Sequence, residues 1–294
     1  MEKYYLVIVF ASLLFSVNTF FNKTYQKNEG ESFEKLMLFM WVSSICGVSI
    51  MLCFSGFKIK ISTFALLMAA LNSLVHITNT IIAMKCISKV NLSLYSLFLM
   101  SGGMILPTLY GFIFNGESLS ATKAICIILL IIALFVSVGK LSNCKGLFYC
   151  ILVFFGNGMY GVITSIYKTK STVYIPDANY NMFVLLYAFI ICSVMLLFIA
   201  PKYKKEHETS LFALNKPKQS YPAAFFYIFA NGTGNFLLLW ALNKGVEVSI
   251  QYPVTTGGTI IFNTVLSILL KEKVPKRNFV AVAIAFAGLV AVCF

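Results

Sequence analysis

Apolar runs separated by short polar segments fill the chain from one end to the other. A bilayer core of about 30 Å needs roughly 20 apolar residues per helix. Runs of that size predict ten membrane-spanning helices, at residues 4–22, 35–56, 63–86, 91–114, 120–139, 146–168, 179–200, 221–243, 248–270 and 277–294. Because most connections are short, neighbouring helices are expected to form antiparallel hairpins. The longest gap, 201–220, is expected to be a solvated loop.

One motif occurs twice in this pattern, at an offset of 155 residues. It consists of a small hydroxyl residue, two glycines and a glutamate 14 residues after the second glycine. The two copies are Ser101-Gly102-Gly103 with Glu117, and Thr256-Gly257-Gly258 with Glu272. Each copy belongs to a unit of five helices, and five is odd, so the second unit must enter the membrane from the opposite side. The predicted fold is an all-α membrane protein whose ten transmembrane helices form two inverted five-helix repeats, residues 1–140 and 141–294.

The composition fits this prediction, since 59% of the residues are hydrophobic and only 11% are charged, against about 25% charged in soluble domains. The net charge of +13 comes from lysines that lie between the apolar runs, where charge sets membrane topology. The expected partner is therefore the lipid bilayer and not nucleic acid. The eight cysteines form no CxxC pair and only two histidines exist, so no metal and no cofactor is expected.

Polar side chains within the predicted helices are the candidates for a substrate path, because they are costly in hydrocarbon. Asn72, His76 and Asn79 are spaced four and three residues apart and so share one helix face. Asn231 is the counterpart of His76 at the 155-residue offset. The predicted substrate-binding residues are His76, Asn79, Asn72, Asn231, Asn235, Trp240, Tyr252, Gln251, Asn18 and Asn157.

Each candidate also has a simpler interpretation. A membrane asparagine can serve only as a hydrogen bond between helices. His76 could carry a proton near neutral pH or stay neutral and hydrogen-bonded. Four aromatic residues near helix ends could stack on a substrate or anchor the helix at the membrane interface: Tyr95, Tyr160, Trp240 and Tyr252. Lys85 could attract an anionic substrate or extend to the headgroups.

The repeated motif and two prolines are assigned structural roles. Gly102, Gly103, Gly257 and Gly258 should permit close helix packing. Pro107 and Pro253 can kink their helices, and we expect them to act as hinges. Glu117 and Glu272 lie three residues before Ser120 and Pro275, the expected N-cap and first-turn proline of the next helices. They are expected to stabilise the N-termini of helices 120–139 and 277–294.

The ten runs, the Gly-Gly and Glu pattern after Ala83-Met84 and Ala241-Leu242, and the apolar last runs at 125–139 and 279–294 resemble the drug/metabolite transporter superfamily, in its EamA-like branch. The resemblance covers the whole chain. It implies ten helices with both termini inside, and a function in exporting amino acids or other metabolites, or in exchanging nucleotide sugars and phosphorylated sugars. Its acidic residue usually follows a glycine. Gly116-Glu117 fits that pattern and Lys271-Glu272 departs from it.

The predicted function is that of a secondary transporter, which moves a small polar metabolite such as an amino acid across the cell membrane by alternating access, in the direction of export. No phosphate-binding loop for ATP is present, and the acidic residues fall in gaps or at helix ends. No enzyme activity is expected, although a receptor, a scaffold or a membrane-embedded enzyme is the alternative. The sequence leaves open whether the protein forms a homodimer. The gaps after the odd-numbered helices, together with the adjoining helix ends, hold 16 of the 23 lysines and arginines. This distribution would put both termini outside, against the resemblance.

Overall fold

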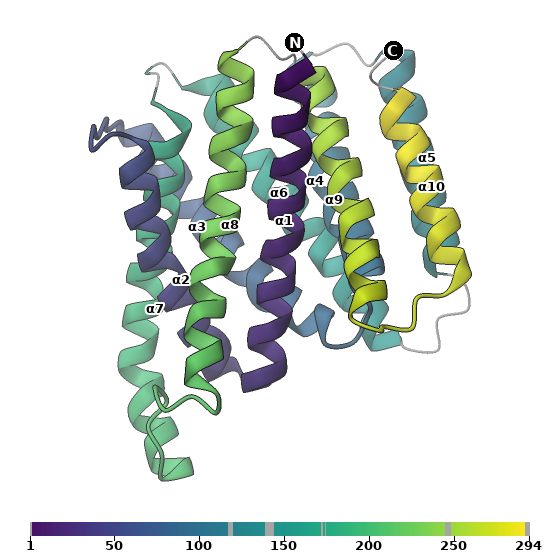
Figure 1. The fold of residues 1–294 in the computed structure, drawn as a ribbon. Helices are drawn as coiled ribbons and strands as arrows, with labels where there is room; N and C mark the ends of the chain where they lie inside the picture. The colour runs from purple at the N-terminus through teal and green to yellow at the C-terminus, as the bar shows by residue number, and fades with distance from the viewer. Residues whose placement is uncertain are drawn as a thin grey trace.

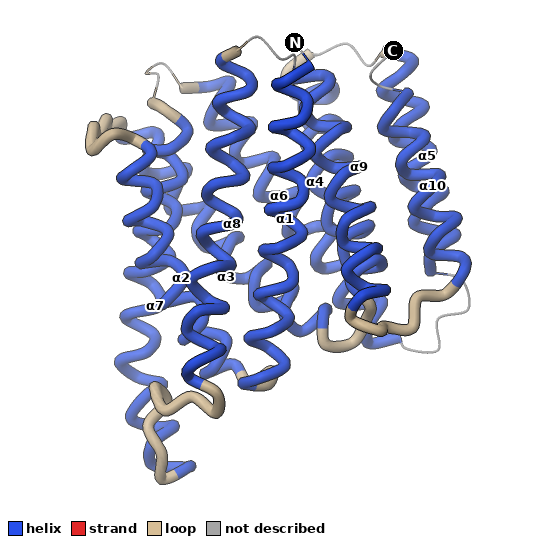
Figure 2. Tube along the Cα trace, in the orientation of Figure 1, coloured by secondary structure: helices blue, strands red, loops and turns tan. Residues whose placement is uncertain are grey.

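The computed structural model of the chain describes residues 2–116, 120–138, 144–171, 173, 175–244 and 248–291. These residues form ten helices and contain no strand (Figure 2). The helices are α1 (Glu2–Glu29), α2 (Phe33–Phe54), α3 (Thr63–Ile87), α4 (Leu92–Phe114), α5 (Ala121–Val138), α6 (Cys144–Lys170), α7 (Asp177–His207), α8 (Pro217–Asn243), α9 (Val248–Leu269) and α10 (Lys276–Ala291). The predicted all-α class is confirmed for this part of the chain.

Local capping signals set several of these boundaries. The Asn91 side chain accepts a hydrogen bond from the backbone N–H of Leu94 at 2.9 Å, which caps the start of α4. Gly30 ends α1 with a φ of +87°, a left-handed conformation that glycine adopts at little cost. Its N–H donates to the Gln26 carbonyl at 2.8 Å.

Two helices continue well past the C-terminal end that the apolar pattern predicts. Helix α1 continues from residue 22 to Glu29, and α7 continues through Pro201 to His207. The expected loop at 201–220 was therefore wrong, because only residues 208–216 connect α7 to α8. Outside the bilayer a helix needs no apolar side chains, and the Lys202–Glu206 pair at 3.8 Å, one helical turn apart, supports the extension.

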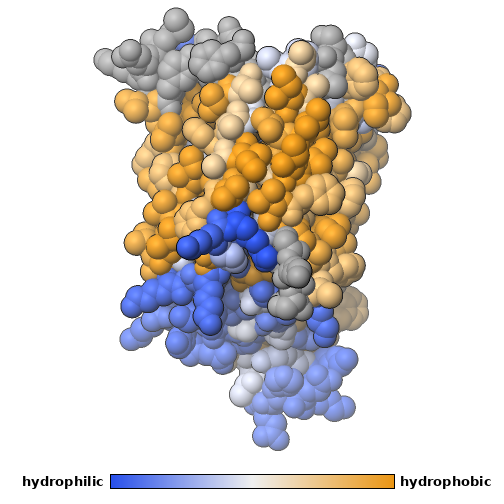
Figure 3. All heavy atoms as spheres, turned by 90° about the vertical axis from the view of Figure 1, so that its right-hand side faces the viewer, coloured by the Kyte–Doolittle hydropathy of each residue, from blue (hydrophilic) through white to orange (hydrophobic). Residues whose placement is uncertain are grey.

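Within the residues that the structure describes, seven helices, α1 to α7, are long and apolar enough to cross a bilayer. The apolar part of α9, Val254–Leu269, is shorter. Large apolar side chains cover the outer surface, and Phe135 and Phe198 are 77% and 75% exposed. Figure 3 shows this apolar surface as a broad band above a hydrophilic end. These features are those of a multi-pass membrane protein.

Helix α1 begins and α10 ends at the same end of the bundle (Figure 1). The other end, where α1, α3, α5, α7 and α9 finish, receives the gaps that hold most of the lysines. We call it the basic end.

The most extensive contacts join helices that are far apart in the sequence. They pair α1 with α8, α4 with α6, α2 with α7, α5 with α10, and α3 with α6. Consecutive helices do run antiparallel (Figure 1), but most consecutive pairs make few contacts. Neighbouring helices are therefore antiparallel, as expected, but they pack mainly against helices that are distant in the sequence. Side chains of the large apolar core around α2, α3, α7 and α8 bury more surface against distant helices than a short turn can offer.

The first glycine pair lies at the closest contact in the bundle. A Cβ atom at Gly102 would overlap the backbone of Phe154 in α6, and one at Gly158 would lie 2.8 Å from the Gly102 carbonyl. One turn further along, Pro107 packs against Gly161 of α6. The second pair differs, because a Cβ at Gly257 would meet only side chains of α10, those of Phe286 and Leu289 at 3.1 and 3.3 Å.

The backbone is alike at the ends of α4 and α9. Gly116 has a φ of +67° and Lys271 has a φ of +56°, and the two positions are 155 residues apart. Lys271, which stands where the family pattern has a glycine, therefore adopts the same left-handed conformation as Gly116. A left-handed conformation costs a residue with a Cβ about 1–2 kcal/mol.

Replacing Gly102 with alanine should destabilise the protein, because the new methyl meets backbone atoms that cannot move aside. We expect Gly102→Ala to lower the free energy of unfolding by about 1–3 kcal/mol, and Gly257→Ala by less, because side chains can shift. Thermal unfolding of both variants in one detergent measures the difference. Equal losses would show that the α4–α6 contact is not unusually close.

Replacing Lys271 with glycine should stabilise the protein by about 0.5–1 kcal/mol. Glycine adopts a positive φ without strain, and the higher conformational entropy of the unfolded chain offsets only part of this stabilisation. The matched control is Lys273→Gly, at a nearby turn residue without a positive φ, which should not stabilise. The same unfolding assay applies, and equal effects of the two variants would contradict the assignment of strain to Lys271.

Candidate functional site

Helix α9 carries a row of polar side chains that repeats at every fourth residue. Its members are all buried: Gln251, Thr255, Thr259, Asn263 and Ser267. Four residues exceed one helical turn by about 40°, so each member lies close to the next while the row winds slowly around the helix. The row therefore extends along almost the whole length of α9.

The row turns from α1 toward α4 as it approaches the basic end. Ser16 of α1 donates to the Thr259 carbonyl at 3.3 Å. Further along, the Ser267 hydroxyl accepts from the backbone N–H of Ser93 at 3.0 Å, and the Ser93 hydroxyl lies 2.9 Å from that of Thr264. The polar row thus lies at the junction of α1, α4 and α9.

Several polar atoms of this row have no hydrogen-bond partner among the described residues. They are Gln251 Oε1, Thr255 Oγ1 and both side-chain polar atoms of Asn263. A buried polar group left unpaired costs about 1–3 kcal/mol, and Asn263 is completely buried. The row is therefore chemically suited to water or to a polar solute that supplies these hydrogen bonds.

Helix α1 presents a similar row to α9. Its buried polar residues are Ser12, Ser16, Thr19 and Asn22. A Cβ at Gly258 would lie 2.7 Å from Ser12 Oγ, so this glycine lets α9 approach the α1 row. Asn22 Oδ1 has no partner within the described part of the chain. Two polar rows therefore face each other across the α1–α9 contact.

A second polar group lies among α3, α6 and α8. The rings of His76 and Tyr160 have centroids 6.2 Å apart, and the Tyr160 hydroxyl lies 3.4 Å from Asn181 Oδ1 of α7. The Tyr227 hydroxyl lies beside Thr80 and Asn18. The structure thus places two of the predicted residues, His76 and Asn18, near two tyrosines and a threonine. Tyr160 was a candidate for stacking on a substrate or for anchoring its helix, whereas Tyr227 and Thr80 were not predicted.

Three of the predicted asparagines connect helices. Asn72 donates to Thr164 Oγ1 at 3.0 Å and to the Tyr180 hydroxyl at 3.1 Å. Asn157 donates to the Leu99 carbonyl of α4 at 2.7 Å, and Asn18 donates to the Tyr227 carbonyl of α8 at 2.9 Å. The simpler interpretation, a hydrogen bond between helices, describes these three residues.

The remaining candidates are dispersed. Asn79 packs against Gly156 of α6, whereas Asn235 donates to the Asn231 carbonyl of its own helix at 2.8 Å. Trp240 is 38% exposed near the end of α8, and the Lys244 ammonium lies 6.0 Å from its ring. Glu117 and the side chains of Tyr252 and Pro253 lie outside the described residues.

Glu272 contacts a helix other than the expected one. One carboxylate oxygen pairs with Lys23 of α1, and the other accepts from the backbone N–H of Leu92 at 2.8 Å. Leu92 is the first residue of α4. The prediction that Glu272 stabilises the start of α10 was therefore wrong, because the fold brings the α3–α4 turn beside the α9–α10 turn.

An open cavity of about 860 Å³ lies beside Glu272 at the basic end. It lies between the end of α1, the α3–α4 turn and the α9–α10 turn. Its charged lining residues are Lys23, Lys27, Glu31, Lys89, Glu272 and Lys273. Four lysines against two glutamates leave two positive charges in excess.

Glu31 neutralises one of these lysines. Lys89 Nζ donates to Glu31 Oε2 at 2.9 Å. Burial alone would raise the pKa of the Glu31 carboxyl, but hydrogen bonds from Lys89 and Ser88 and the nearby charges of Lys89 and Lys85 hold that pKa below its ordinary value. The pair therefore stays charged at neutral pH.

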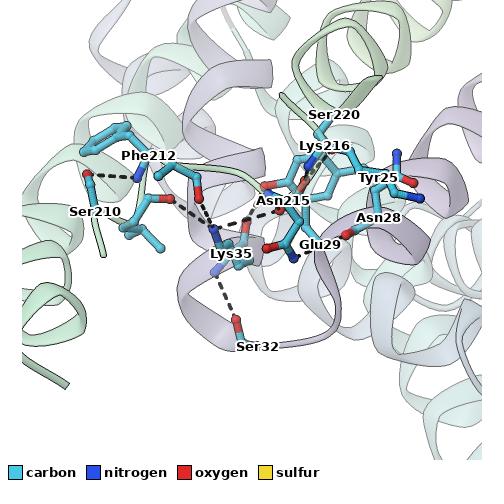
Figure 4. Close-up of polar contacts among 12 residues, drawn as sticks. Tyr25, Asn28, Glu29, Ser32, Lys35, Ser210, Phe212, Asn215, Lys216 and Ser220 are labelled. Carbon is cyan, nitrogen blue, oxygen red and sulfur yellow. Dashed lines mark hydrogen bonds and ion pairs between the residues drawn. The ribbon is translucent and has the colours of Figure 1, made fainter. Parts of the chain in front are cut away.

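A second charged group at the basic end joins α1 and α2 to the α7–α8 connection (Figure 4). The carboxylate of Glu29 is fully buried and accepts from the backbone N–H groups of Asn215 and Lys216 at 2.8 and 3.0 Å, and from Ser220 Oγ at 2.6 Å. It therefore caps the start of α8 from another helix. The sequence indicated only that Glu29 lies in a gap.

Lys35 completes this group. Its ammonium lies 3.9 Å from Glu29 Oε2 and donates to the carbonyls of Leu211 and Ala213 at 3.3 and 3.2 Å. The Tyr25 hydroxyl donates to the Lys35 carbonyl at 2.8 Å. The described residues contain no group of three or more His, Cys, Asp or Glu side chains that could hold a metal ion.

Comparison with protein-family models gave no match, and comparison with curated proteins gave none either. Among solved structures, one described only as "Crystal structure of protein" is similar over 99% of this chain and 98% of its own, with a TM-score of 0.57 and 12% sequence identity. At this identity the likeness concerns the fold alone.

Removing the charge of Glu29 should destabilise the protein, because Lys35 would remain buried without its counter-charge. We expect Glu29→Gln to lower the free energy of unfolding by about 3 kcal/mol, measured by thermal unfolding in detergent. The control is Glu206→Gln, which breaks an exposed pair with Lys202 and should change stability by less than about 1 kcal/mol. Similar small losses in both variants would show that the buried group does not fasten α8.

Proposed function

We propose that this protein is a secondary transporter that exports a small polar metabolite, an amino acid or a similar solute, across the cell membrane by alternating access. The observation that carries the proposal is the pair of facing polar rows on α1 and α9. They are buried, their polar atoms are only partly paired, and the α9 row runs toward the basic cavity beside Glu272. A packed, inert interface in a membrane protein would not retain such groups.

We also propose that the ten helices cross the membrane as two inverted repeats. If the two repeats are equivalent, each helix corresponds to the helix five places along, and each contact should have an equivalent contact. The α1–α8 contact then corresponds to α6–α3, α4–α6 to α9–α1, and α2–α8 to α7–α3, and all of these contacts exist. The α2–α7, α5–α10 and α4–α9 contacts exchange into themselves. The matching left-handed residues Gly116 and Lys271 add support.

The two equivalent interfaces differ in a way that suits alternating access. At the α4–α6 interface Gly102 meets the backbone of Phe154, whereas at its counterpart between α9 and α1 Gly258 meets the hydroxyl of Ser12. In alternating access, two inverted repeats exchange their conformations, so that the path opens first to one side of the membrane and then to the other. Pro107, beside Gly161, is suited to act as a hinge.

Membership of the drug/metabolite transporter superfamily, in its EamA-like branch, is part of this proposal. Supporting it are the ten helices and the repeated glycine pairs.

The proposal predicts that Asn263→Leu abolishes transport without loss of stability. Leucine has nearly the same volume and removes the unpaired polar atoms, so the free energy of unfolding should stay constant or rise by about 1 kcal/mol. Purified protein in liposomes, tested with a panel of amino acids, vitamins, choline and nucleotides, should show saturable transport that falls at least about tenfold in the variant.

The control for this experiment is Asn157→Leu, which removes a paired amide and should reduce stability. Liposomes without protein correct for leakage. Saturable transport that persists in Asn263→Leu would exclude the α9 row as the path. No transport of any solute by the wild-type protein would favour a receptor or scaffold.

A further inference from the structure

The floor of the basic cavity already holds a carboxylate. Glu272 is bound there by the ammonium of Lys23 and by the N–H of Leu92 at the start of α4. An ammonium group together with a free backbone N–H at a helix start is a favourable site for a carboxylate or phosphate oxygen. The protein's own side chain thus shows which chemical group this site accepts.

The charge around the site favours a second anion. Lys27 and Lys273 line the cavity, and among the described residues neither forms an ion pair with an acidic side chain. Lys89 is neutralised by Glu31. The excess positive charge is therefore available to a solute in a cavity of about 860 Å³, which has room for a metabolite.

We propose that the cavity is a receiving site for the carboxylate of the transported solute, and that this carboxylate replaces Glu272 at Lys23. The proposal rests on the transport function and specifies its substrate class as organic acids and amino acids, with cations excluded. Lys27 and Lys273 attract the anion, and Lys23 binds it.

The replacement has a consequence for the path. Glu272 connects the α9–α10 turn to both α1 and α4, so its release removes the charged contacts between these three elements. The remaining contacts are neutral: Asn91 Nδ2 donates to the Lys273 carbonyl at 3.3 Å, and Asn278 Nδ2 donates to Asn91 Oδ1 at 3.2 Å. Arrival of the correct solute thus loosens the end of α9, whose polar row begins at the same junction.

Binding can be measured separately from transport. The purified protein in phosphatidylcholine nanodiscs is titrated with acetate, glycine and methylammonium at constant ionic strength, and the unfolding temperature is followed as a function of concentration. Acetate and glycine should raise it saturably, and methylammonium should not. Lys27→Gln and Lys273→Gln should each weaken binding about 5-fold, whereas Lys204→Gln, an exposed lysine on α7 outside the cavity, should leave it unchanged.

Glu272→Gln distinguishes replacement from a purely structural role. If the solute competes with Glu272, this variant binds acetate more tightly than the wild-type protein. Weaker binding in Glu272→Gln, or equal binding in all the lysine variants, would overturn the proposal. Should Glu272→Gln fail to fold, the comparison of Lys27→Gln with Lys204→Gln decides alone, because both residues are exposed.

A parallel titration in nanodiscs with phosphatidylglycerol tests a lipid headgroup as the occupant. Acetate binding in phosphatidylcholine nanodiscs supports a free solute as the occupant of the site. A site that binds no acetate in phosphatidylcholine, and changes stability only with phosphatidylglycerol, would overturn the proposal. Carboxylate binding without transport of any solute would refute the transport function and leave the site intact, whereas transport of cations alone would refute the site and leave transport intact.

Discussion

Hydrocarbon offers no hydrogen-bond partner, and this constraint governs how the ten helices pack. Polar side chains in the interior must find partners on other helices, and Asn72, Asn157 and Asn18 do so by joining helices that are distant in the sequence. The groups that find no partner are informative for the same reason. Several lie on α9, at Gln251, Thr255 and Asn263, where unpaired groups would be a pure cost in a protein whose interior stayed dry.

The repeated glycine pair illustrates how one motif can produce two interfaces. On α4, Gly102 permits direct contact with the backbone of α6. On α9, Gly258 lies against Ser12, so the glycine brings two polar rows together. The difference depends on the partner helix, because a glycine supplies only the absence of a side chain. One interface is therefore a close backbone contact, and the other carries polar side chains from both helices.

Two glutamates at the basic end perform the same physical task. Glu29, at the end of α1, binds the free N–H groups at the start of α8, and Glu272, after α9, binds the N–H of Leu92 at the start of α4. In both cases a lysine shares the carboxylate. The two differ in burial, since Glu29 is inaccessible and Glu272 faces an open cavity. The first is suited to a permanent fastening and the second to a contact that a solute can replace.

The sequence alone determined the ten helices and most of their boundaries, because an apolar run and a capping residue are local properties of the chain. It also indicated Gly102 and His76 as unusual residues at depth. Only the tertiary structure decided the partners of these residues. The spacing of Gln251, Thr255, Thr259, Asn263 and Ser267 is visible in the sequence, but their burial against α1 and α4 is not. Glu272 could not be assigned to α4 in advance, since 180 residues separate it from Leu92 and no local pattern records which distant helix start it will meet.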